Sequence, residues 1–307
     1  MTGRGARPLI VATRPSALAR LQGDFVIQAL AAAGRRVEPK PKVIRTTGDR
    51  VLDRPLPEIG GKGLFTAEIE EALRNGEVDL AVHSLKDLPI EPPPGIRLAA
   101  IPEREDPRDV LASIRHGSLA DLPPGAVVGS SSLRRRAQLL ALRPDLAVEP
   151  IRGNVETRLR KMAEGQFAAV VLAAAGLVRL GLTQSIVEWL SFNVMLPAPG
   201  QGALAVQCRD DDPATIAALA DIDVPDIRRA VEAERAFLDG LGGGCSAPVG
   251  AYGRVEGGRV QLDGLVASID GRHIVRVHAE GDDPLDLGRR LADLAIRQGA
   301  AALLVHA

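Results

Sequence analysis

The sequence predicts two doubly wound α/β lobes with a hinge, followed by a smaller C-terminal α+β domain with a three-stranded antiparallel sheet. In the first two thirds of the 307 residues, short apolar strands alternate with amphipathic helices. The alternation begins again after the Pro92–Pro94 turn, and from Val249 the apolar period changes to two. We place the first lobe at 1–102 and 200–221, the second lobe at 103–199, and the C-terminal domain at 222–307.

Apolar runs and helical periodicity define the elements of the first lobe. Gly34 and Gly76 each follow a periodic segment, which is the usual signal for the end of a helix. The expected strands are 9–13, 42–46 and 78–83, and the expected helices are 16–33 and 64–75. Such alternation indicates a mostly parallel sheet, and ligands of these sheets bind beyond the carboxyl ends of the strands.

The second lobe repeats this pattern. Its expected strands are 126–129, 147–151 and 168–173, and its expected helices are 133–142 and 155–164. The segment 196–208 is rich in glycine and proline at its start, so we expect it to form the return crossing and the hinge.

Alternation with period two predicts an antiparallel meander in the C-terminal domain, with strands at 249–255, 260–268 and 273–279. Gly257-Gly258 and Asp270-Gly271 are typical of the turns between such strands. A last helix is expected after Pro284, because leucines recur on one face.

Composition narrows the function classes. Aromatic residues make up only 2% of the chain and the net charge is -1, which disfavours base stacking and general polyanion binding. The segment 130–161 nevertheless holds eight basic and three acidic residues, a net charge of +5. This segment therefore predicts a localised anion site.

The cysteines, histidines and apolar runs of the sequence indicate the compartment of the protein and whether it binds a membrane or a metal. Cys208 and Cys245 are too few for a disulfide framework, which favours a reducing cytoplasm. The apolar run near the N-terminus is too short for a signal-peptide core, and no other run approaches a membrane span. The five histidines lack ligand spacing, so we expect no metal site.

Cys245 lies in a glycine loop, GGGCSAPVG. A lone cysteine is most often a small core residue, as Cys208 is expected to be in the strand LAVQC. Three preceding glycines open the backbone around Cys245, and we therefore expect an accessible thiol there.

Two further motifs follow predicted strands. HSLKDLP places Lys86 and Asp87 at a strand end, either as a solvated charge pair or as part of a site. GSSSLRRR offers a serine N-cap, a helix N-terminus and arginines suited to planar carboxylates. A nucleotide phosphate could use the same geometry, so this motif alone does not identify its anion.

These motifs, in this order from about Leu9 to Gly253, resemble the porphobilinogen deaminases (hydroxymethylbilane synthases). The match is most specific where Glu-Arg-Ala-Phe at 234–237 precedes the Cys245 loop. The resemblance implies a transferase that joins four porphobilinogen molecules head to tail, releasing ammonia, to give hydroxymethylbilane in haem biosynthesis. It also implies a dipyrromethane cofactor bound to Cys245 through a thioether, and a cytoplasmic monomer that binds no nucleic acid or membrane.

The resemblance assigns roles to individual residues. Asp87 would be catalytic, stabilising the positive charge of the azafulvene that forms as ammonia leaves. Besides Cys245, the cofactor would contact Lys86, Ser132, Arg134, Arg135 and Arg158. Substrate would contact Arg14, Ser16, Arg152 and Arg179. Loop or gating contacts are expected for Asp49, Asp53, Lys62, Phe65 and Gln201. Arg136 is expected to face solvent, and Thr47 departs from the family pattern, in which arginine is frequent.

Three alternative interpretations share some of these sequence features. Two lobes with a hinge are also the architecture of periplasmic solute-binding proteins, but the expected lack of a signal peptide and the accessible Cys245 both count against this alternative. An arginine-rich RNA binder is disfavoured by the composition given above. A P-loop is excluded, because GGKG lacks the distant first glycine and the following serine or threonine.

Overall fold

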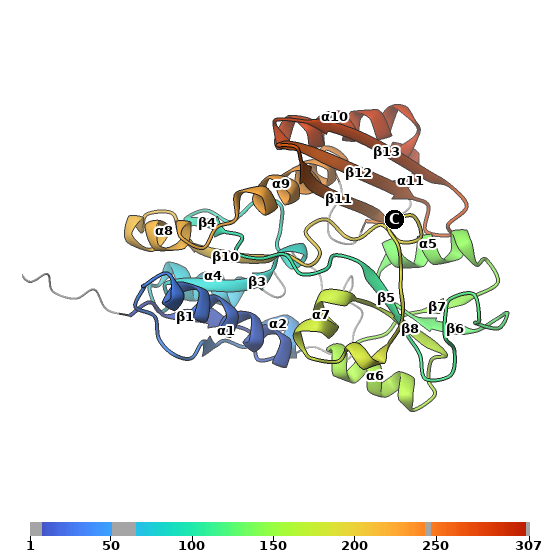
Figure 1. Ribbon diagram of the computed structural model, residues 1–307, viewed down its shortest axis with the longest axis horizontal. Helices are drawn as coiled ribbons and strands as arrows, with labels where there is room; N and C mark the ends of the chain where they lie inside the picture. Colours follow the sequence, from blue (N-terminus) through green and yellow to red (C-terminus); the bar gives the residue numbers. More distant parts are fainter. Residues whose placement is uncertain (1–7, 51–65, 243–246, 305–307) are drawn as a thin grey trace, which may run out of the picture. The chain divides into compact units, whose positions relative to one another are not determined.

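The computed structural model describes residues 8–50, 66–242 and 247–304, and the chain forms two compact units. Each unit is built from two stretches of the chain: Met1–Glu103 with Ala203–Val224, and Arg104–Gly202 with Pro225–Ala307. Figure 1 follows the chain from the blue N-terminal elements to the red C-terminal ones.

The first unit is built on a five-stranded sheet of order β2-β1-β3-β10-β4. Its strands are β1 (Val11–Thr13), β2 (Lys42–Val43), β3 (Leu80–Ser84), β4 (Ile96–Ala100) and β10 (Leu204–Arg209). Its helices are α1 (Ala17–Ala32), α2 (Thr47–Arg50), α4 (Ala67–Arg74) and α8 (Pro213–Ala220), with a 3₁₀ turn η1 at Leu85–Asp87.

Both faces of this sheet are covered. Val26, Ile27 and Leu30 of α1 pack with alternate residues of β3 and β10 on one face. On the other face, Ile69 and Leu73 of α4 pack against Ala81. A strand buried on both faces must be apolar at almost every position, and this explains the apolar run at residues 80–82 of β3.

The second unit contains another five-stranded sheet, of order β7-β6-β8-β5-β9. Its strands are β5 (Asp109–Ala112), β6 (Val127–Gly129), β7 (Ala147–Glu149), β8 (Ala169–Ala173) and β9 (Ile186–Trp189). Its helices are α5 (Leu133–Leu142), α6 (Val155–Ala163) and α7 (Ala174–Arg179), with a 3₁₀ turn η2 at Thr183–Ser185. Leu139 of α5 and Met162 of α6 belong to cores on opposite faces of the sheet.

Strand direction corrects one expectation. Strands β1, β2 and β3 run parallel, as do β6, β7 and β8. However, β10 is antiparallel to both of its neighbours, and so is β5. The prediction of mostly parallel sheets is therefore wrong for β5 and β10, because neither strand is joined directly to a sheet neighbour by the helical crossover that links parallel strands.

The second unit also holds the predicted antiparallel meander, of order β11-β12-β13. Its strands are β11 (Val249–Glu256), β12 (Arg259–Ala267) and β13 (Ile274–Gly281), and its helices are α9 (Pro225–Gly240), α10 (Pro284–Arg297) and α11 (Ala300–Leu304). Gly257 and Gly258 both have positive φ, as a tight hairpin turn requires. Gly288 lets α10 approach α9 closely, since a Cβ there would lie 2.5 Å from the Ala233 carbonyl oxygen.

Candidate active site

In the first unit, one edge of the sheet collects predicted site residues. Parallel strands end at the same edge, so the loops after β1 and β3 begin side by side. Arg14 and Ser16 follow β1, and Lys86 and Asp87 follow β3. The Ser16 hydroxyl caps α1 by accepting the amide of Ala19 at 3.2 Å.

The turn that carries Lys86 and Asp87 is held in place by hydrogen bonds of the residues just before them. Leu85 is fully buried, and its amide donates to the Ala203 carbonyl at 3.0 Å. The Gln22 amide on α1 donates to the Ser84 hydroxyl at 3.0 Å. Lys86 is half-buried and Asp87 is exposed. The backbone under Asp87 is thus fixed while its carboxylate can meet a ligand.

Arg14 and Asp49 form an ion pair of 2.5 Å at this end of the unit. Thr46 also donates to Asp49, from its amide at 3.1 Å and from its hydroxyl at 2.9 Å. Burial raises the pKa of Asp49, but these hydrogen bonds outweigh burial and hold the pKa below its ordinary value. Asp49 is therefore held by Arg14 and Thr46 within α2, and its role as a loop or gating contact stays a prediction.

His83 is not among the site residues predicted from the sequence. It lies in β3, is 6% exposed, and its Nε2 has no hydrogen-bond partner among the described residues. Burial and the nearby Arg14 charge lower its pKa to about 4, although the Gln207 side chain acts in the opposite direction. The ring is therefore neutral at physiological pH. The only sequence signal was its place in an otherwise apolar strand.

The second unit repeats the arrangement at the carboxyl edge of β6, β7 and β8. Ser132 follows β6, Arg152 follows β7, and α7 with Arg179 follows β8. The Ser131 hydroxyl donates to the Ile151 carbonyl at 2.8 Å and accepts the Ile151 amide at 3.0 Å. These reciprocal hydrogen bonds hold the loop after β6 against the loop after β7.

Arg134 and Arg135, in the first turn of α5, are buried at 3% and 6% exposure. Ser132 caps this helix, as predicted, by accepting the Arg135 amide. Both guanidinium groups pair with Asp109 of β5 at 2.7 Å. Burial raises the pKa of Asp109, but the two arginines outweigh burial and hold it well below its ordinary value. The sequence reading did not select Asp109.

Arg136 corrects a further expectation. It is half-buried, and its Nη1 donates to the Val148 carbonyl at 2.7 Å. The prediction that Arg136 faces solvent is therefore wrong, because the start of α5 lies against β7 on that side.

The remaining arginines of this edge bind loop carbonyls. Arg158 Nε donates to Gly153 at 2.9 Å, and Arg179 Nη2 donates to Gly202 at 2.8 Å. Both side chains are half-buried, as is Arg152, so each can also face a ligand. Gln201 is fully buried, and its amide donates to Asp109 at 2.9 Å.

Two models of known families match this chain. One, described as porphobilinogen deaminase, dipyromethane cofactor binding domain, matches residues 9–217, and the other, described as porphobilinogen deaminase, C-terminal domain, matches residues 228–296. The chain belongs to the porphobilinogen deaminase family. The porphobilinogen deaminase of Roseiflexus sp. is 52% identical, covering 96% of this chain and 98% of that protein. That of Pelobacter propionicus is 50% identical, covering 97% and 96%.

Two solved structures each cover 70% of this porphobilinogen deaminase family member, at low identity. The methionine-binding protein MetQ covers 70% of this chain and 89% of its own, at 14% identity and a TM-score of 0.43. The GluR0 ligand-binding core from Nostoc punctiforme covers 70% and 91%, at 16% identity and a TM-score of 0.40.

Four predicted site residues of this family member lie outside the described residues. They are Cys245, Asp53, Lys62 and Phe65. Within the described ranges, no helix is long and apolar enough to cross a membrane, and no cluster of three potential metal ligands occurs.

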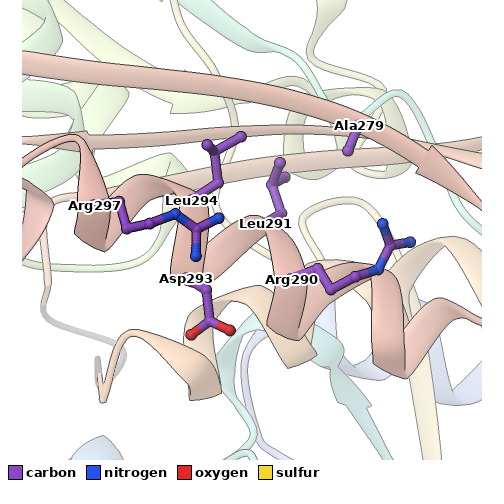
Figure 2. Close-up of a pocket in the computed structure, with 6 residues that line it drawn as sticks. All are labelled: Ala279, Arg290, Leu291, Asp293, Leu294 and Arg297. Carbon is purple, nitrogen blue, oxygen red and sulfur yellow. The ribbon is translucent and has the colours of Figure 1, made fainter.

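A cavity of about 250 Å³ lies between β13 and α10 of the second unit. It is lined by Ala279, Arg290, Leu291, Asp293, Leu294 and Arg297. Figure 2 shows Leu291 and Leu294 pointing toward the strand of Ala279, while Asp293 points away from it. Because its polar groups do not converge and no predicted site residue lines it, this cavity is not the candidate active site.

Proposed function

We propose that this chain carries out the reaction of the family to which it belongs. It would join four porphobilinogen molecules head to tail, with loss of ammonia, to form the linear tetrapyrrole hydroxymethylbilane for haem biosynthesis. The observation that carries the proposal is the family match over residues 9–217 and 228–296, a span that includes the motif residues at both sheet edges. We also propose that the protein is a cytoplasmic monomer.

The residues at these edges suit a ligand with many carboxylates. Each pyrrole of the substrate bears one acetate and one propionate, so a dipyrromethane bears four carboxylates. Arg134 and Arg135 share one buried counter-ion, and Nε of Arg134 is buried without a hydrogen-bond partner among the described residues. An arginine edge of this kind binds a carboxylate through two parallel hydrogen bonds. These donors therefore fit a dipyrromethane.

We propose that Cys245 holds the dipyrromethane through a thioether. The cofactor, when bound, supplies the free α-carbon from which the chain grows. Its carboxylates would be held by Lys86, Ser132, Arg134, Arg135 and Arg158. Incoming substrate would be held by Arg14, Ser16, Arg152 and Arg179. Loop contacts would come from Asp49, Asp53, Lys62, Phe65 and Gln201.

Asp87 is the proposed catalytic residue. As ammonia leaves the aminomethyl group of the substrate, positive charge develops on the pyrrole. An ionised carboxylate beside the pyrrole N–H stabilises this charge. The anchored turn suits this role, because a fixed carboxylate needs little reorganisation as the charge appears.

Intact-protein mass tests the proposal. We expect purified protein to exceed its sequence mass by two linked pyrrole units, and Cys245→Ser to lack this excess. Cys208→Ser, which changes the other cysteine, should retain it. Active wild-type protein with an unmodified mass would refute the proposed attachment.

A second experiment tests the catalytic role. Asp87→Asn should keep the mass excess and lose turnover by roughly two to four orders of magnitude. The exposed neighbour Glu91 provides the control, since Glu91→Gln should leave the rate unchanged. A near-normal rate in Asp87→Asn would remove Asp87 from this role.

A further inference from the structure

Asp109 is a fully buried carboxylate at the first position of β5. Its Oδ2 accepts from Arg134 Nη1 at 2.7 Å. Its Oδ1 accepts from Arg135 Nε at 3.0 Å and Nη2 at 2.7 Å, and from Gln201 Nε2 at 2.9 Å. One carboxylate thus fixes three side chains from two segments of the chain.

The charges of this cluster do not balance. Two arginines, each less than 10% exposed, share the single negative charge of Asp109. Among the described residues, no other acidic side chain forms an ion pair with Arg134 or Arg135. A buried excess of one positive charge is unfavourable until an anion joins it, so the cluster favours the binding of a further carboxylate.

The two arginines use Asp109 differently. Arg135 turns its Nε and Nη2 onto Asp109, and its Nη1 donates to the Val171 carbonyl at 3.0 Å. Arg134 binds Asp109 and the Leu196 carbonyl through Nη1 alone. The Nε of Arg134 has no partner among the described residues, which leaves the Nε–Nη2 edge available. This edge has the geometry that binds a carboxylate through two hydrogen bonds.

We propose that Asp109 is a positioning residue for the cofactor site. It fixes the Arg134 guanidinium so that its free edge meets a carboxylate of the dipyrromethane, and Arg135 and Gln201 hold Asp109 in place for this purpose. The inference rests on the proposed function, because it takes the dipyrromethane as the ligand of α5. Asp109 itself does not touch the cofactor.

The test compares cofactor content in two variants that each lose one buried carboxylate. In Asp109→Asn, the fraction of folded chains with the two-pyrrole mass excess should fall at least about ten-fold, as expected when a buried hydrogen-bonded charge is removed. The matched control is Asp79→Asn in the first unit, where Asp79 is 1% exposed and accepts the Ile10 amide at 2.8 Å. We expect Asp79→Asn to keep the full mass excess even if its melting temperature falls as far as that of Asp109→Asn.

A milder variant keeps the test decisive if Asp109→Asn does not fold. Gln201→Met removes one of the four hydrogen bonds to Asp109 and leaves both ion pairs, so the fraction of loaded chains should fall in the same direction by a smaller factor. Folded Asp109→Asn, or failing that Gln201→Met, with wild-type cofactor content would overturn the inference. Absence of the mass excess from wild-type protein and the Asp79 control would instead refute the proposed function.

Discussion

Glu234 of α9 accepts a hydrogen bond from Arg104 Nη1 at 2.6 Å and is itself fully buried. The same carboxylate accepts the amides of Gly200 and Gly253, each at 2.6 Å. One side chain thus joins α9, the turn before β10 and strand β11 inside the second unit.

Removing Glu234 should therefore destabilise this unit strongly. We expect Glu234→Ala to lower the free energy of unfolding by about 3–5 kcal/mol, because a buried arginine loses its counter-ion. Urea unfolding measures this change. The control is Arg160→Ala, which breaks the exposed Arg160–Glu164 pair and should cost less than about 1 kcal/mol. Equal effects of the two substitutions would contradict the prediction.

His83 should make stability depend on pH. Its pKa is about 4 in the folded chain and near 6.5 when unfolded, so the unfolded chain binds the proton first as pH falls. Stability from this residue is complete above about pH 6.5 and is lost toward pH 4, by a total on the order of 3 kcal/mol.

Unfolding curves between pH 4 and pH 7 test this prediction. His83→Gln cannot titrate, so its stability should fall less across this range than that of the wild type. The exposed His273 provides the control, since His273→Gln should keep the wild-type slope. Identical slopes for wild type and His83→Gln would show that the ring gains its proton without cost.

Cys208 should be chemically silent in the folded protein. It is fully buried, and burial raises its pKa to about 11, so almost no thiolate exists at pH 8. In Cys245→Ser protein, a thiol reagent should therefore label nothing under native conditions and one thiol per chain in denaturant. Rapid native labelling would contradict the burial of Cys208.

Gly288 should resist substitution although it lies inside a helix. Alanine there gains up to about 1 kcal/mol of helix propensity. Its methyl group, however, would meet the Ala236 Cβ and the Ala233 carbonyl oxygen at 2.5 Å. We expect Gly288→Ala to lower the melting temperature, with a net cost of about 1–3 kcal/mol. The control is Asp293→Ala, on the exposed side of the same helix, which should change the melting temperature little. An unchanged melting temperature in Gly288→Ala would show that α9 and α10 can move apart to admit the methyl group.

Local signals in the sequence located the elements well, but not their neighbours in the sheets. The predicted helix 133–142 has the bounds observed for α5, and Ser132 caps it as expected. Strands β4, β5 and β9 were not predicted; β5, for example, follows a charged stretch and has only four residues. The position of β10 between β3 and β4 has no local signal, since it depends on pairing with residues more than 100 positions away.

In the candidate site, too, residues with a local sequence signal could be predicted, and residues that depend on distant contacts could not. Motif residues reach the two sheet edges because each follows a parallel strand, which the sequence pattern can indicate. Asp109 and His83 could not be selected in this way, because a single polar residue in an apolar strand does not reveal its partners. Their importance follows from burial and hydrogen bonding, which arise only when distant segments pack.

The place of β10 has a consequence for protein synthesis. The five-stranded sheet of the second unit is complete once Trp189 has been made, whereas the sheet of the first unit needs residues up to Arg209. On the ribosome, the lobe that is translated first must therefore wait for β10, which lies between β3 and β4, while the lobe translated later can complete its five-stranded sheet earlier. In nascent chains stalled with only residues 1–202 emerged, the lobe translated later should accordingly resist protease, while the lobe translated first should still be cleaved.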